Sequence, residues 1–406
     1  MKIALLSPDQ PDWVTKIDAL WTKLRPLHGK FLLPRHFVTS ALTRIGGQVI
    51  CIYAANEQTL MGVGFLLPRA GSSYIMRYHL LTEHNADFLQ AIKERVAIRL
   101  EADVHLYDPA APQFYTPTYQ QYGEINIGHP DADEAEEIRA LQQNVWGATA
   151  DYLYPSDLHS DGFGLGKSLV ARIDGKLAGY LFGFHRKGGP ALPSSWRGQY
   201  NEKWRLESQL MAVAPEHRGK RLGYLLKMVQ AEMARAQGLD IIHWTTDPLL
   251  YPNAVLNFGL LRAVAFDFKA DLYPFRNALN QVPASRFQLT WPITADEVCS
   301  LDIRMDKPTV IDLSQRPEIE RVNQRHLAPD LVATARRIAI EIPRDWQAFQ
   351  LASLNAALQW RTTTDLLFDH YLGIEPNSYI IRDVGRDGER SFLVAERNIV
   401  LENNIF

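Results

Sequence analysis

The stretch VAPEHRGKRLGYLLK, from Val213 to Lys227, decides how the middle of this chain folds. An apolar run stops at Pro215, which lacks a backbone donor, and this predicts the end of a strand. Four basic side chains follow, and Gly223 then opens a helix whose apolar residues recur on one face. A helix N-terminus has backbone N–H groups without intrahelical acceptors and about half a positive charge, so anions bind there readily. We interpret the turn as an anion-binding cradle; the alternative is the plain start of a solvated helix.

The residue types within the turn suit a phosphate ligand. Gly219 and Gly223 carry no Cβ and let the backbone approach closely, while Arg218, Lys220 and Arg221 add positive charge. Two better-known phosphate loops are excluded, since neither GxxxxGK[ST] nor GxGxxG is present in this turn.

Composition limits the class of protein. A chain of 406 residues is too long for one compact core, so we expect two or three domains. The net charge of −3 gives no general reason to expect nucleic-acid binding, so any electropositive site must be local. Cys51 and Cys299 lie far apart without metal-type spacing, and we expect neither a disulfide framework nor a metal site.

The location of the protein is predicted from two absences in the sequence. The opening MKIALLSPDQPDW has too short an apolar run for a signal peptide. No apolar stretch approaches the roughly 20 residues that span a bilayer. We therefore expect a cytoplasmic protein without membrane or nucleic-acid partners.

The periodicity of the middle region predicts alternating helices and strands. The elements expected in order are a helix at 131–147, a hairpin at 168–185 around Asp174-Gly175, a loop rich in Gly, Pro and Ser at 186–201, a strand at 204–213, a helix from Leu222 to Ala236, a strand at 240–247, a helix near 253–263 and two further strands. This order is typical of a mixed α/β domain.

The flanking regions have their own patterns. The first 118 residues repeat part of the same order, which predicts a diverged duplication; a generic α+β domain is the alternative. Near the C-terminus we expect a strand, a helix of about 25 residues from Pro343 to Tyr371 and a hairpin. We therefore predict domains at 1–118, 119–293 and 294–406, the last a small α+β module.

The pattern V-x-P-x-x-R-G-x-x-x-G on a strand, turn and helix resembles motif A of the GNAT superfamily of acyl-CoA N-acyltransferases. The resemblance covers roughly residues 121–293 and implies a central mixed sheet flanked by helices, with residues 1–118 as a degenerate GNAT-like copy. It also implies acetyl-CoA, or another acyl-CoA, as cosubstrate. In the family, the strand hydrogen-bonds the pantetheine and the turn wraps the CoA pyrophosphate. Carried over, the cofactor-binding residues are Leu210, Met211, Ala212 and Val213 beside the pantetheine and thioester, and Arg218, Gly219, Lys220, Leu222, Gly223 and Tyr224 around the pyrophosphate.

Arg221 departs from the family pattern, because it stands where the first pyrophosphate glycine is usual. We expect its backbone to keep the right-handed helical φ, with the amide toward the phosphate and the side chain within reach of the nucleotide phosphates. The alternative is that the position needs glycine-only dihedrals, which would weaken CoA binding. Two further stretches, HWTTDPLLYPNAVLNFGLLRA and RIAIEIPRDWQAFQ, resemble a subgroup of large, mostly uncharacterised GNAT proteins, some of which are thought to acylate amino acids, including with succinyl-CoA.

Glu207 is our candidate general base. N-acyl transfer needs a deprotonated amine, attack on the thioester carbonyl and protonation of the leaving thiolate. Glu207 lies eleven residues before Arg218, the offset at which histone acetyltransferases of the superfamily have their catalytic glutamate. Strand alternation predicts Glu207, Gln209, Met211 and Val213 on one face. A salt-bridged structural glutamate is the alternative.

Other site candidates follow the turn along the chain. His243 is a second candidate base, against the alternative of a packed histidine. The family tyrosine that protonates the thiolate is replaced by Leu260, so Tyr251 is our candidate proton donor. Tyr273 and Tyr224 are further candidates, and a structural role is the alternative for each of the three tyrosines. Asn253 and Asn257 lie one helical turn apart and are predicted to face the same way, toward the cofactor.

Side chains for the acceptor are predicted on loops around the same region. The substrate candidates are Trp146, Asp151, Arg197 and Asp247. We expect an N-acyltransferase that moves an acetyl or succinyl group to the primary amine of a small molecule such as an amino acid, with a homodimer left open. The alternatives are a non-catalytic acyl-CoA-binding or sensory protein, and an acetyltransferase of a protein or antibiotic amine.

Overall fold

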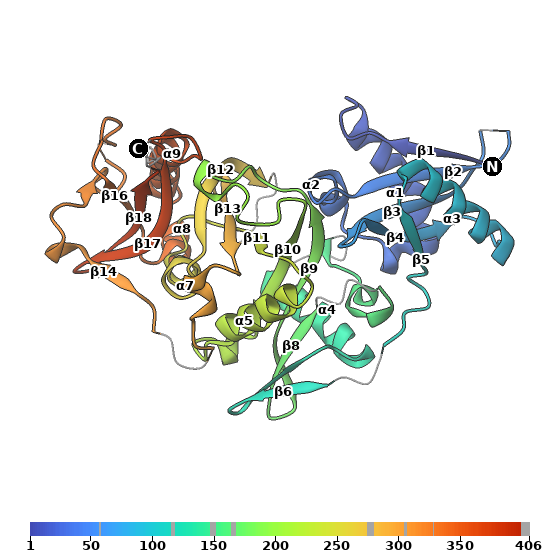
Figure 1. The fold of residues 1–406 in the computed structure, drawn as a ribbon, viewed down its shortest axis with the longest axis horizontal. Helices are drawn as coiled ribbons and strands as arrows, with labels where there is room; N and C mark the ends of the chain where they lie inside the picture. The colour runs from blue at the N-terminus through green and yellow to red at the C-terminus, as the bar shows by residue number, and fades with distance from the viewer. Residues whose placement is uncertain are drawn as a thin grey trace, which may run out of the picture. The chain divides into compact units, whose positions relative to one another are not determined.

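The computed structural model describes residues 1–56, 58–114, 118–146, 152–163, 168–273, 280–303, 307–327 and 329–398 (Figure 1). The chain divides into two compact units. Unit 1 comprises residues 1–189 and 202–239, and unit 2 comprises residues 190–201 and 240–406.

Unit 1 contains an N-terminal sheet of five strands in chain order. They are β1 (Lys2–Leu6), β2 (Gln48–Tyr53), β3 (Leu60–Arg69), β4 (Ser73–Leu80) and β5 (Asp103–Tyr107). The first four pair antiparallel, and β5 joins β4 in parallel after helix α3 (Ala86–Leu100). Helix α3 packs its buried Ile92 and Val96 on one face of this sheet. Helix α1 (Trp13–His28), the π-helical turn η2 (Phe37–Ala41) and the short helix α2 (Leu42–Arg44) supply a separate apolar cluster.

The second sheet of unit 1 is an antiparallel meander. Its strands are β6 (Tyr119–Tyr122), β7 (Ile125–Gly128), β8 (Leu169–Ile173), β9 (Lys176–Lys187) and β10 (Trp204–Val213), in that order. The hairpin of β8 and β9 turns at Asp174 and Gly175, both with positive φ as a tight two-residue turn requires. Helix α4 (Ala132–Trp146) packs against β9 and β10, and helix α5 (Leu222–Arg235) packs against β8, β9 and β10.

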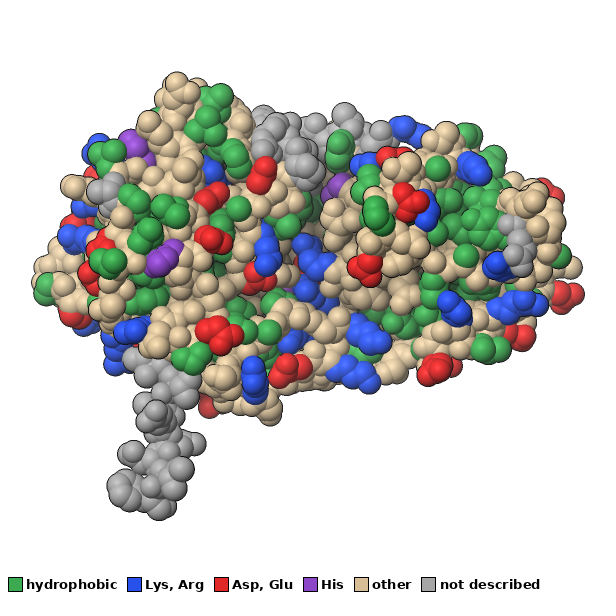
Figure 2. Space-filling view, turned by 90° about the horizontal axis from the view of Figure 1, so that it is seen from above, with side chains coloured by type: hydrophobic (Ala, Val, Ile, Leu, Met, Phe, Trp, Pro, Cys, Tyr) green, Lys and Arg blue, Asp and Glu red, His purple; other side chains and the backbone are tan. Residues whose placement is uncertain are grey.

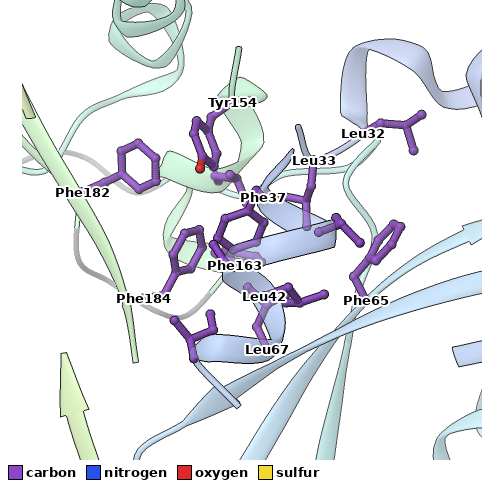
Figure 3. Packing of buried hydrophobic residues seen from close by; sticks show 14 of the residues in the cluster. Leu32, Leu33, Phe37, Leu42, Phe65, Leu67, Tyr154, Phe163, Phe182 and Phe184 are labelled. Atoms are coloured by element: carbon purple, nitrogen blue, oxygen red, sulfur yellow. The ribbon is translucent and has the colours of Figure 1, made fainter. Parts of the chain in front are cut away.

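One apolar cluster joins the two sheets of unit 1 (Figure 3). Phe37 and Leu42 come from the N-terminal region, while Phe182, Phe184 and Tyr154 come from the region of the second sheet. The ring centroid of Phe37 lies 5.0 Å from that of Phe184 and 5.7 Å from that of Tyr154. Each such buried aromatic contributes about 1.5–3 kcal/mol over its exposed state, so the cluster makes the N-terminal region an integral part of this unit.

Unit 2 contains a mixed sheet in the order β15-β16-β18-β17-β12-β13-β11, with β14 beside β17. The strands are β11 (Ile241–Thr246), β12 (Val264–Tyr273), β13 (Ala284–Pro292), β14 (Val310–Asp312), β15 (Glu320–Arg321), β16 (Arg337–Ile342), β17 (Tyr379–Asp387) and β18 (Arg390–Arg397). The helices are α6 (Tyr251–Ala254) with the π-helical turn η8 (Val255–Leu260), α7 (Asp296–Cys299), α8 (Trp346–Ala352) and α9 (Leu354–Tyr371). Helix α9 packs on β12 and β16.

The predicted mixed α/β fold is confirmed, with large mixed sheets flanked by helices. One predicted element is wrong in detail, since the helix expected from Pro343 to Tyr371 is two helices separated at Ser353. The backbone of Ser353 is extended and its hydroxyl accepts from the N–H of Ala356, so it ends α8 and caps α9. The domain limits at 118 and 293 and the duplication stay predictions.

Two features of the described residues bear on partners. None of the helices they form is both long and apolar enough to cross a bilayer. On the face drawn in Figure 2, Lys and Arg side chains are interspersed with Asp and Glu.

Candidate functional site

The basic turn leads from β10 into α5, as the sequence predicts. Strand β10 ends at Val213, and a short 3-10 turn at Pro215–His217 follows. Gly219 has φ +80°, and a Cβ added there would meet nothing within 4 Å. The side chains of Arg218, Lys220 and Arg221 are exposed. The turn therefore presents its backbone and its cations to solvent beside the N-terminus of a helix.

The backbone conformation of Arg221 differs from the one that the sequence predicts. The expected right-handed φ is wrong: Arg221 has φ 62° and ψ 15°, in the left-handed region. A side chain there costs roughly 1–2 kcal/mol, because Cβ crowds the following carbonyl. The guanidinium carbon lies 5.0 Å from the ring centroid of Tyr224, and this cation–π contact offsets part of that cost. The turn thus keeps a conformation that favours glycine while carrying an arginine.

We predict that Arg221→Gly is more stable than Arg221→Ala by about 1 kcal/mol. Both variants lose the guanidinium and its contact with Tyr224, but only glycine adopts φ 62° without strain. Urea unfolding of the two variants measures the difference directly. Equal stability, or a more stable alanine variant, would contradict the left-handed conformation.

Strand β10 carries a bulge that changes which residues share a face. Its register against β9 shifts between Ser208 and Leu210, and Gln209 is the extra residue. Directly opposed residues of an antiparallel pair lie on the same face. Glu207 opposes Phe184, Leu210 opposes Phe182 and Ala212 opposes Tyr180, all three aromatic partners belonging to the shared apolar cluster.

The predicted grouping of Met211 and Val213 with Glu207 is therefore wrong. The bulge reverses the alternation, so Leu210 and Ala212 lie on the face of Glu207 instead. Gln209 donates from Nε2 to the hydroxyl of Tyr154 at 2.8 Å, on the side of the same cluster.

Glu207 is buried, with 2% of its surface exposed, and both of its oxygens are hydrogen-bonded. Arg186 of β9 donates from Nη1 to Oε2 at 2.7 Å. Arg44 of α2 donates from Nη2 to Oε1 at 3.3 Å. The candidate base is thus part of a buried ion cluster that includes an arginine from the N-terminal region.

The other face of β10 meets a buried lysine. Lys227 of α5 is 2% exposed, and its Nζ donates to Oγ of Ser208 at 2.8 Å. Burial lowers the pKa of Lys227 well below its ordinary value of 10.5, while the charge of Glu207 opposes this shift. A buried amine with a lowered pKa therefore lies under the strand next to its bulge.

We predict that Lys227→Met changes how stability depends on pH. Between the lowered pKa and 10.5 the unfolded chain binds the proton and the folded chain does not, so wild-type stability rises with pH in that window. The methionine variant lacks this dependence and gains most over wild type at the lower pH. Urea unfolding at pH 8 and pH 10 tests this, with the exposed Lys176→Met as control. A stability difference that is the same at both pH values contradicts it.

Unit 2 holds the candidates that follow the turn along the chain. His243 of β11 is fully buried, and its Nδ1 lies 3.0 Å from the carbonyl oxygen of Leu289 and 3.3 Å from Oγ1 of Thr290. Tyr251 is buried at the start of α6, and its hydroxyl accepts from Nε of Arg386 at 3.2 Å. Both side chains are held by local partners.

Asn253 and Asn257 differ in exposure. Asn253 is exposed and Asn257 is 3% exposed. The helix changes from α to π at Val255, and four residues make about one turn in either form. The shared face of the two asparagines therefore stays a prediction, and only Asn257 is buried in unit 2.

Asp247 belongs to a buried ion cluster of unit 2. Nη2 of Arg361, on α9, donates to Oδ1 at 2.9 Å and to Oδ2 at 2.7 Å. Nη1 of Arg286 lies 3.4 Å from Oδ2, and the N–H of Leu249 donates to Oδ1. Burial raises the pKa of the neighbouring Asp365 to about 6. Asp247 thus ties the segment after β11 to α9.

We predict that Asp247→Asn destabilises the protein by about 3 kcal/mol, because Arg361 would keep a buried charge without its carboxylate. Glu318→Gln is the matched control, since Glu318 pairs with Arg316 where both side chains are over 60% exposed, and it should cost less than about 1 kcal/mol. Equal losses in urea unfolding would show that the buried pair contributes no more than a surface pair.

The other three substrate candidates are Arg197, Asp151 and Trp146. Arg197 is exposed and follows the 3-10 turn Ser194–Trp196. Asp151 and the side chain of Trp146 lie outside the described residues. In the part of the chain that the structure describes, no three His, Cys, Asp or Glu side chains gather as metal ligands.

Several residues around the candidates were not predicted. Arg44 and Arg361 carry no local signal, because each contacts its carboxylate across more than 100 residues of sequence. Lys227 had a signal, since it follows Leu226 in a helix segment that is otherwise apolar. Arg186 directly ends the apolar run of β9, which also marks it as unusual.

Comparison with known proteins places this region in a family. Residues 133–255 match the family model described as the acetyltransferase (GNAT) family. Residues 133–255 therefore form a GNAT-family region of this chain. No curated protein matches the chain.

Solved structures that are similar to the chain include several acetyltransferases. Arabidopsis thaliana Naa50 with a bisubstrate analogue is 13% identical, over 41% of this chain and 97% of that one, with a TM-score of 0.31. Diaminobutyrate acetyltransferase EctA from Paenibacillus lautus, with its substrate and coenzyme A, is 15% identical over 43% and 98%, with a TM-score of 0.30. A putative acetyltransferase, yncA from Salmonella typhimurium, with acetyl-CoA, is 17% identical over 44% and 99%, with a TM-score of 0.33.

Proposed function

We propose that the chain is an acyl-CoA-dependent N-acyltransferase that moves an acetyl or succinyl group to the primary amine of a small molecule such as an amino acid. The observation that carries this proposal is the turn from Arg218 to Gly223. It combines two left-handed backbone positions, exposed cations and a helix N-terminus, within a region that matches the GNAT family model.

The turn suits the pyrophosphate of CoA for electrostatic reasons. The first N–H groups of α5 have no acceptor within the helix, and its dipole favours an anion at this end. Arg218 and Lys220 are exposed and add charges that strengthen hydrogen bonds to phosphate oxygens. Gly219 leaves the backbone open to close approach. CoA would supply the activated thioester, and the turn would hold its diphosphate.

In the transfer itself, the nitrogen of the neutral amine attacks the thioester carbon, a C–N bond forms and the C–S bond breaks. The amine must lose a proton and the thiolate must gain one. We assign proton acceptance to Glu207, directly or through water, because it lies in β10 just before the bulge, on the strand that leads into the turn. Tyr251 stays the candidate donor of the proton to the thiolate, and His243 stays the second candidate base; each is already hydrogen-bonded within unit 2.

A second function has an observation in its favour. Both oxygens of Glu207 accept hydrogen bonds from guanidinium groups, which is also what a structural ion cluster would show. A non-catalytic acyl-CoA-binding protein would need the turn and no base. The two functions differ in turnover and not in CoA affinity.

We predict that Gly219→Ala lowers CoA affinity at least about tenfold, or about 1.4 kcal/mol. The added Cβ strains the left-handed position and lies against the bound diphosphate. Gly175→Ala is the matched control, because Gly175 has φ +72° and is equally open, yet lies in the hairpin turn of β8 and β9. Isothermal titration of CoA measures both. Loss of affinity in both variants, or in neither, would contradict the assignment of the turn.

Turnover separates the two functions. Thiol release from acetyl-CoA and succinyl-CoA is followed with a panel of amino acids, polyamines, aminoglycosides and peptides. Transfer to an amine that is lost in Glu207→Gln supports the enzyme with Glu207 as base. Tight CoA binding without transfer to any amine supports the binding protein. Transfer to peptides or aminoglycosides alone would replace the small-molecule acceptor by a protein or an antibiotic.

A further inference from the structure

Arg44 is a residue of the N-terminal region whose guanidinium lies at the candidate base. It is the last residue of α2, and its Nη2 donates to Oε1 of Glu207 at 3.3 Å across 163 positions of sequence. The other oxygen of Glu207 is held by Arg186, so the carboxylate lies between two guanidinium groups. Arg186 alone could rotate with the carboxylate, whereas partners on both oxygens fix the plane of the group.

The segment that carries Arg44 is fixed by packing. Phe37, Val38 and Leu42 of η2 and α2 are fully buried in the shared apolar cluster. The ring of Phe37 lies against those of Phe184 and Tyr154 (Figure 3). These contacts place α2 over the face of β10 that carries Glu207. A segment packed in this way is a rigid support and not a mobile gate.

The chain just after Arg44 is also fastened to the second sheet. The N–H of Lys187, at the end of β9, donates to the carbonyl oxygen of Ile45 at 2.9 Å. Gly46 has φ +84°, and a Cβ built there would lie 2.9 Å from Cβ of Lys187, so the two backbones approach as closely as glycine allows. Arg44 is therefore held next to the strand that bears Arg186.

A buried ion pair is a third contact between the N-terminal sheet and the rest of unit 1. Arg77 of β4 and Asp157 form a fully buried ion pair, with Nε and Nη2 of Arg77 donating to the two carboxylate oxygens at 3.2 and 2.5 Å. The hydroxyl of Tyr107 donates to the carbonyl oxygen of Asp157. The segment that leads from Tyr154 to Asp157 is thereby attached to the N-terminal sheet, and Tyr154 in turn contacts Gln209 at the bulge.

We propose that Arg44 is a positioning residue for acyl transfer: the N-terminal region supplies the guanidinium that, with Arg186, orients the carboxylate of Glu207. The inference rests on the proposed function of Glu207 as base. In this proposal Arg44 acts through Glu207 and has no contact with CoA. The N-terminal region is then part of the catalytic apparatus and not merely a scaffold beside it.

The test compares Arg44→Met, Arg44→Lys and Arg35→Met in the full-length protein. Arg35 is the matched control, because it also pairs with a carboxylate in the N-terminal region, that of Asp18, but both side chains are over 40% exposed. Measurements are kcat and KM with acetyl-CoA and the accepted amine, the Kd of CoA by titration, and the midpoint of thermal unfolding.

Arg44→Met should lower kcat at least tenfold while the Kd of CoA changes less than twofold, and Arg44→Lys should recover most of the lost kcat. Arg35→Met should leave all values unchanged. A merely structural role would lower kcat and CoA affinity together with the unfolding midpoint, without recovery by lysine, and that result would overturn the inference. A folded Arg44→Met variant with wild-type kcat would overturn it as well.

The experiment distinguishes an error in the proposed function from an error in the role of Arg44. If wild-type protein acylates no amine, the enzyme assignment falls and the role of Arg44 falls with it. If wild type is active and Arg44→Met is equally active, the role of Arg44 alone is refuted.

Discussion

The apolar cluster shared by Phe37, Tyr154, Phe182 and Phe184 is the contact on which unit 1 depends. It fills the face of the second sheet opposite α5, so the surroundings of Glu207 are set by residues of the N-terminal region. Without this packing Glu207 would have only Arg186 as a partner, on a strand face open to water. Because the cluster is rigid, the polar groups at its edge, Arg44 among them, take fixed positions.

The two faces of β10 offer two different kinds of polar group. One face presents an ionised cluster around Glu207, and the other presents Ser208 with the buried amine of Lys227. The bulge at Gln209 lies between them and displaces the strand locally from β9. A buried lysine in an interface of helix and sheet is unfavourable for folding alone, and it remains close enough to Glu207 for their charges to interact. Both groups therefore act on the same short piece of strand.

Periodicity was sufficient to find the strands, the hairpin around Asp174 and the helix that begins at Leu222, since each depends on neighbours in sequence. The bulge could not be found in this way. One extra residue leaves the strand apolar and only moves the side chains that follow it to the opposite face of the sheet. The π-helical turn after Ala254 is hidden for the same reason, because the apolar pattern does not reveal the change of helical pitch. Contacts such as Arg44 with Glu207 require the tertiary fold, which no local pattern contains.

Arg221 shows why residue identity is an unreliable guide to backbone conformation at a tight turn. An arginine at this position predicts a right-handed helical φ, since side chains disfavour the left-handed region. The structure has φ 62° there because the path of the turn is set by its ends: β10 must stop at Val213 and α5 must begin at Leu222, with Gly219 already left-handed between them. The arginine is accommodated within this path by placing its guanidinium over Tyr224. The turn thus has the left-handed backbone that glycine favours. The arginine side chain adds a positive charge and, because it lies over Tyr224, leaves the backbone of the turn exposed.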